Sequence, residues 1–143
     1  MQLSASNQLT DMKPILTTLF FACLFISGCS TPESLKGFDS ETWISDRKGC
    51  KGDRAALVYE LDSLRKDFYN KKEYVVRQVL GKPDHEELLE RSQRIYIYYI
   101  EPGTQCAGRG EMSDANRVEV RINSLAKVSE ITYKEPLISK KPE

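Results

Sequence analysis

The chain has 143 residues, with 21 Lys or Arg and 21 Asp or Glu, so its formal net charge is zero. A neutral chain argues against nucleic acid as a partner, since nucleic acids bind a basic face, and against binding to anionic membrane surfaces through a basic cluster. Even without its first 28 residues the chain is long enough for one domain with a hydrophobic core and too short for two.

An uncharged apolar segment occupies residues 15–27, after the single base Lys13. As a helix it would span about 20 Å, less than the hydrocarbon core of a bilayer. Its length and position are typical of a secretory signal peptide, so residues 1–28 are predicted to be removed. The alternative is a short transmembrane or buried helix. Residues 1–11 are polar, and a start of translation at Met12 would omit them.

The apolar segment ends in Ile26-Ser27-Gly28-Cys29, which resembles the bacterial lipobox of an aliphatic residue, two small residues and a cysteine. In proteins with this motif the cysteine receives fatty acids such as palmitate and becomes the first residue of the mature chain. Cys29 is therefore predicted to anchor the protein in a membrane through lipid. Ser30 differs from the Asp that retains lipoproteins in the inner membrane, so the resemblance implies the outer membrane, facing the periplasm.

Residues 29–40 are polar and are predicted to be a tether between the lipid and a single domain over 41–135. The segment 43–54 has two glycines and the only tryptophan, which predicts a loop. It is either a cap that packs Trp43 on the core or a recognition loop. In the second case the candidate contact residues are Trp43, Asp46, Arg47 and Arg54.

Two amphipathic helices are expected next. The first has Asp53 as its N-cap and runs through Tyr69, with an apolar stripe and with Arg54 outside that stripe. The stripe consists of Leu57, Leu61, Leu64 and Phe68, widened by Val58. The second helix runs over 72–80 and ends at Gly81, which is predicted to be a left-handed terminator.

Four strands are expected after the helices, over 87–90, 94–100, 117–123 and 127–133. Both faces of 94–100 are apolar, so both should be covered. Its tyrosines, Tyr96 and Tyr98 above all, are either core residues or contacts with a partner. Val128 is out of step with Ile131, which predicts a bulge or a twist in the last strand. Residues 136–143 are predicted to be a flexible tail.

Apart from the lipid-bearing Cys29, two cysteines, Cys50 and Cys106, remain in the exported part of the chain. Because extracytoplasmic compartments are often oxidising, we predict that they form a disulfide bond. This bond would bring segment 43–54 and the long loop 101–116 to one end of the sheet. The alternatives are free thiols or a metal pair, but the chain has one histidine, His85, and no ligand cluster, so no metal or other cofactor is predicted.

The lipobox, two short helices, the helix exit Leu80-Gly81-Lys82-Pro83, the tyrosine-rich strand and the closing hairpin resemble the SmpA/OmlA lipoproteins, which include a subunit of the outer-membrane β-barrel assembly machinery. Over about residues 53–133 the resemblance implies an α+β fold of two helices packed on a three- to four-stranded antiparallel sheet, as also in β-lactamase-inhibitor-like modules. The cysteine-containing segments are additions to that pattern. The resemblance implies no particular binding residues.

The chain has none of the sequence motifs of hydrolases, P-loop proteins or zinc proteases, so it is not expected to be an enzyme. Two functions remain. The first is a lipid-anchored envelope module that binds a partner protein, in outer-membrane assembly or maintenance. The second is a small-molecule or glycan-binding lipoprotein with a pocket between Trp43 and the Cys106 loop.

Overall fold

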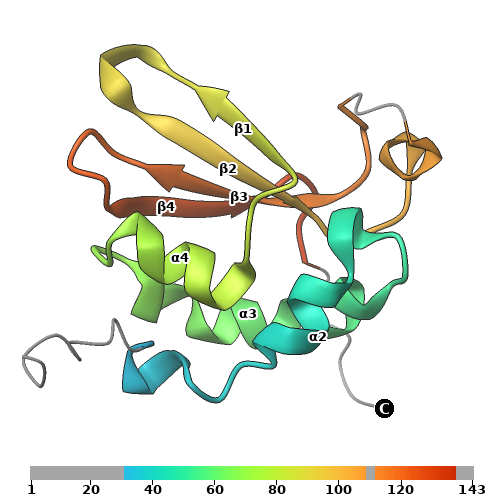
Figure 1. Cartoon of the computed structure of the whole chain (residues 1–143), viewed down its shortest axis with the longest axis horizontal. Helices are drawn as coiled ribbons and strands as arrows, with labels where there is room; N and C mark the ends of the chain where they lie inside the picture. Colours follow the sequence, from blue (N-terminus) through green and yellow to red (C-terminus); the bar gives the residue numbers. More distant parts are fainter. Residues whose placement is uncertain (1–30, 109–111, 138–143) are drawn as a thin grey trace, which may run out of the picture. The chain divides into compact units, whose positions relative to one another are not determined.

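The computed structural model describes residues 31–108 and 112–137, so the predicted signal peptide and Cys29 lie outside the described residues. The described part is an α+β unit in which three helices lie on one face of a four-stranded antiparallel sheet (Figure 1). The predicted fold class is therefore confirmed. The elements are α2 (Ser40–Ser45), α3 (Asp53–Phe68), α4 (Glu73–Leu80), β1 (His85–Leu88), β2 (Arg94–Tyr99), β3 (Arg117–Ile122) and β4 (Val128–Tyr133).

The segment before α3 is more ordered than its composition predicts. Trp43 lies in α2, where the side chain of Asp39 caps the helix by accepting a hydrogen bond of 3.0 Å from the backbone of Thr42. This bond also lowers the pKa of Asp39. Leu35 and Phe38 are buried in the core. The prediction of a tether through residue 40 is thus wrong at its end, because two apolar side chains tie that end to the domain.

The two expected helices, α3 and α4, are both present. Gly52, with φ of +90°, occupies the N-cap of α3, and Asp53 stands in the first turn instead of capping it. The predicted stripe is shifted, because Arg54 is buried on the same helix face as Val58. Helix α4 ends before Gly81, as predicted, but Gly81, with φ of +74° and ψ of −165°, does not have the left-handed helical conformation expected of the terminator.

The sheet has the order β1-β2-β3-β4, in which each strand pairs with the next along the chain. The register shifts between Arg121, opposite Glu130, and Ile122, opposite Val128, so the predicted bulge in the last strand is confirmed. The helix-side face of the sheet forms the core with the helices. Its buried residues are Tyr96, Tyr98, Ile100, Val118, Val120, Ile122, Val128 and Ile131.

The other face of β2 is also covered at its end. Ile97 and Tyr99 are 1% and 2% exposed, although they point away from the helices. The Tyr99 hydroxyl accepts a hydrogen bond of 2.9 Å from the backbone of Ser113, in the loop that follows η5 (Thr104–Ala107). At the chain's end, Leu137 packs against the core, so the predicted flexible tail is fixed at its first residues.

Candidate functional site

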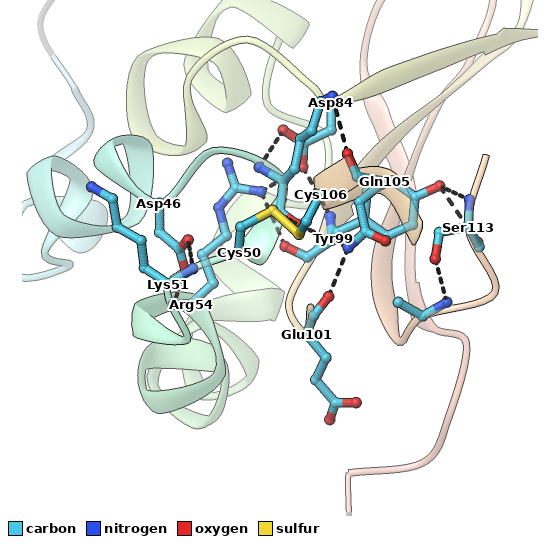
Figure 2. The surroundings of a disulfide bond; sticks show 12 residues. Asp46, Cys50, Lys51, Arg54, Asp84, Tyr99, Glu101, Gln105, Cys106 and Ser113 are labelled. Carbon is cyan, nitrogen blue, oxygen red and sulfur yellow. Dashed lines mark hydrogen bonds and ion pairs between the residues drawn. A yellow bond between two sulfur atoms is a disulfide. The ribbon is translucent and has the colours of Figure 1, made fainter. Parts of the chain in front are cut away.

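The disulfide between Cys50 and Cys106 is present, with their Cα atoms 5.8 Å apart, and it joins the turn after α2 to the loop after β2 (Figure 2). The side chain of Gln105 reinforces the link, since its Nε2 donates to the carbonyl oxygens of Lys48 at 3.0 Å and Glu101 at 2.8 Å. The predicted pairing is confirmed, and the two long segments do meet at one end of the sheet.

Next to the disulfide, Arg54 and Asp84 form an ion pair inside the protein. Arg54 Nη1 lies 2.5 Å from Asp84 Oδ2, and both side chains are 1% exposed. Arg54 also donates to the backbone oxygens of Trp43 and Tyr99, each at 3.0 Å. Asp84 accepts further hydrogen bonds from the backbone of Lys48 at 3.1 Å and Tyr99 at 3.0 Å. A buried charge pair of this kind persists because further hydrogen bonds with backbone groups stabilise both the carboxylate and the guanidinium.

A second carboxylate, Asp46, holds the start of α3. Its two oxygens accept hydrogen bonds from the backbone of Lys51 at 2.7 Å and of Arg54 at 3.0 Å. Gly49 makes the adjacent turn possible, because a Cβ at this position would lie 2.7 Å from the carbonyl oxygen of Tyr99. Together, Asp46, Gly49 and the Arg54–Asp84 pair fasten the α2–α3 turn to the end of β2.

Five of the six candidate contact residues are therefore interior residues, and only Arg47 is exposed. Trp43, Asp46, Arg54, Tyr96 and Tyr98 are all 0% or 1% exposed. None of these five presents a surface to a partner in this conformation. The signal that sequence reasoning missed is Asp84, which is the buried partner of Arg54 and stands immediately after the Pro83 that ends the helix exit.

Polar side chains from α4 surround the Tyr96 hydroxyl. The hydroxyl donates to Glu73 Oε2 at 2.8 Å and accepts from Arg77 Nη2 at 2.8 Å, and Arg77 lies 4.6 Å over the ring. Burial, followed by the hydrogen bond to Glu73, raises the pKa of Tyr96. Glu86 of β1 pairs with Arg77 and Arg94 at 3.3 and 3.5 Å, so the charges of this cluster are largely balanced.

The two edges of the sheet differ. The edge at β4 is occupied where the strand begins, because the backbone of Val128 exchanges hydrogen bonds with Lys71 and Asn70, at 2.9 and 3.0 Å. A bridge between Lys72 and Lys127 extends this contact. At the opposite edge, β1 lies at the margin of the sheet with no helix beside it (Figure 1). Leu88 of β1 is 76% exposed, the largest value among the described large hydrophobic residues.

Among residues 31–108 and 112–137, no group of three or more His, Cys, Asp or Glu could hold a metal ion. Within the same residues, no helix has both the length and the apolar character needed to cross a bilayer. His85, the one histidine, begins β1 and is half-buried.

Comparison with known proteins gives no match: no family model, no curated protein and no solved structure is similar to the chain. The resemblance to the SmpA/OmlA lipoproteins therefore stays a prediction from the residue pattern. The fold defines a small α+β module whose predicted contact residues, apart from Arg47, are interior and whose β1 edge is not covered by another strand or helix.

Proposed function

We propose that the protein is a lipid-anchored module of the bacterial cell envelope that acts by binding a partner protein, in outer-membrane assembly or maintenance. Cys29 carries the lipid, and the outer membrane, facing the periplasm, is the site of action. The folded unit has no need of a cofactor for this role.

The observation that supports this proposal best is the position of the first buried side chain among the described residues. Leu35, 1% exposed, stands six residues after Cys29. A chain of that length reaches no more than about 20 Å when fully extended. A lipid on Cys29 would therefore hold the domain close to the bilayer surface, as suits a module that meets membrane-associated proteins.

Replacement of the lipidated cysteine tests the anchor. Cys29→Ala should move the protein from the membrane fraction to the soluble fraction or leave it uncleaved, since the acyl chains supply the membrane affinity. Cys23→Ala is the matched control, because Cys23 lies in the leader and should leave fractionation unchanged. An unmodified residue 29, with the leader still attached, in mass spectra of the native protein would contradict the proposal.

The alternative, a pocket for a small molecule or glycan beside Trp43, keeps one exposed contact out of four, Arg47. The other three, Trp43, Asp46 and Arg54, are buried, and Asp46 and Arg54 are engaged in hydrogen bonds within the protein. We therefore retain protein binding as the proposed function.

A further inference from the structure

The free edge of β1 presents backbone groups in the pattern that an added strand requires. The backbone N–H of Leu89 donates to the carbonyl oxygen of Gln93 at 2.8 Å, in the same register as the β1–β2 pairs. Hydrogen-bonded pairs alternate with non-hydrogen-bonded pairs in an antiparallel ladder. Glu87 therefore bonds to β2, whereas the N–H and C=O groups of Glu86 and Leu88 point away from the sheet.

The side chains along this edge alternate in chemistry. Glu86 and Leu88 lie on the helix side, where Arg77 and Arg94 already balance the charge of Glu86. Leu88 therefore leaves apolar surface on this side. Glu87 lies on the other face and is exposed. A strand that pairs with β1 would thus meet an apolar surface on one side and a carboxylate on the other.

We propose that the β1 edge binds an extended segment of an envelope protein in which basic and apolar residues alternate. The inference rests on the proposed function and names the surface and the class of partner. Backbone hydrogen bonds to Glu86 and Leu88 supply affinity for any extended segment, whatever its sequence, as in other strand additions. A Lys or Arg opposite Glu87 and an apolar residue beside Leu88 supply the preference.

A second copy of the chain is the less suitable occupant. Antiparallel pairing of two β1 strands centred on residue 87 places Glu87 opposite Glu87 of the second copy. Centring on residue 86 places Glu86 opposite its copy, and centring on Leu88 places Glu86 opposite Glu90; in both registers a further carboxylate is added beside Glu86, whose charge Arg77 and Arg94 balance only once. Like charges directly opposite each other destabilise a strand pair, so charge selects a basic partner over self-association.

Peptide binding to the purified full-length protein tests the preference. One fluorescent eight-residue peptide alternates Lys and Val, and its control alternates Glu and Val. Fluorescence anisotropy should give a Kd for the Lys–Val peptide lower by about fivefold or more, because cross-strand attraction replaces repulsion. Equal binding of the two peptides, or binding of neither, would overturn the inference.

Two variants of one position test the backbone contact. Leu88→Ala and Leu88→Pro both lose the leucine side chain, but only proline removes the outward N–H. The alanine variant should keep binding and the proline variant should lose it, while Trp43 fluorescence reports that both are folded. Equal binding by the pair overturns the proposal. Glu87→Lys supplies an independent readout, since it should reverse the preference between the two peptides.

Photo-crosslinking in the membrane-anchored protein separates this inference from the proposed function. A crosslinking residue is placed at Arg91, next to the β1 edge, or at Leu125, an equally exposed turn position between β3 and β4. A crosslink at 91 that disappears in the Leu88→Pro background supports the edge. Crosslinks to another protein from position 125 alone would contradict binding at the β1 edge but would still support the proposed function. Crosslinks at neither position would count against both, and crosslinks at 91 to a second copy would show that the occupant is wrong.

Discussion

At the residue scale, the Arg54–Asp84 pair is the interaction whose loss should matter most. Asp84→Ala would leave the Arg54 guanidinium buried without its carboxylate and the backbone N–H groups of Lys48 and Tyr99 without an acceptor. Breaking a buried pair in this way costs about 3–5 kcal/mol. Guanidinium unfolding, followed by the fluorescence of Trp43, should report a loss of that size.

The matched control is an exposed ion pair in the sheet. Arg121 and Glu130 lie 3.6 Å apart with side chains 44% and 52% exposed. Arg121→Ala should lower the free energy of unfolding by less than about 1 kcal/mol. If Asp84→Ala and Arg121→Ala lowered the free energy of unfolding by similar amounts, the buried pair would not be the more important of the two interactions.

A second prediction at this scale concerns high pH. Burial raises the pKa of Tyr98 far above its ordinary value, and its hydroxyl donates to the carbonyl oxygen of Gly81 at 3.0 Å. Above about pH 10 the unfolded chain releases this proton while the folded chain keeps it. The free energy of unfolding is therefore unaffected by Tyr98 ionisation below that pH and falls as the pH rises further.

Replacing Tyr98 by a residue without the ionisable hydroxyl should make the free energy of unfolding depend less on pH above pH 10. Tyr98→Phe should be less stable at pH 8 by about 1–3 kcal/mol, because the Gly81 oxygen loses its donor. Between pH 10 and 11 its stability should fall less steeply than that of the wild type, by up to about 1.4 kcal/mol per pH unit. Parallel pH profiles for the two proteins would show that Tyr98 does not titrate in this way.

At the element scale, the disulfide connects two segments that have no ladder between them. The cysteines are separated by 56 positions, and closing such a loop stabilises a fold by about 4 kcal/mol in the chain-entropy account. The Cys50→Ser/Cys106→Ser double variant should lose that much. Added reductant should reduce the stability of the wild type toward the variant and leave the variant unchanged. A variant as stable as the oxidised wild type would contradict this.

The elements also show what a local pattern can predict. The two helices, the stop at Gly81, the bulge near Val128 and the cysteine pair each leave a signal within a few residues or in residue type. The burial of Arg54 leaves none, because it depends on Asp84, 30 positions away. Helix α2 has six residues, too few for a periodic stripe, so Trp43 was expected in a loop.

At the scale of the whole molecule, the short connection before Leu35 should orient the domain. If Cys29 carries lipid, Lys36 lies within a few residues of the anchor, whereas Arg91 stands in the turn between β1 and β2. In Figure 1 this turn lies across the helical layer from the segment around residue 36. The β1 edge would then face away from the bilayer, where an extended partner segment can reach it.

Quenching by lipid measures this orientation. A fluorescent amino acid is placed at Lys36 or at Arg91 in lipidated protein on vesicles whose acyl chains carry a quencher. The probe at 36 should be quenched more strongly, because about 20 Å of extended chain is the most that can separate Leu35 from the anchored residue. The same two probes in Cys29→Ala protein should respond alike and weakly. Stronger quenching at 91 than at 36 would place the β1 edge against the membrane and leave no room there for a partner strand.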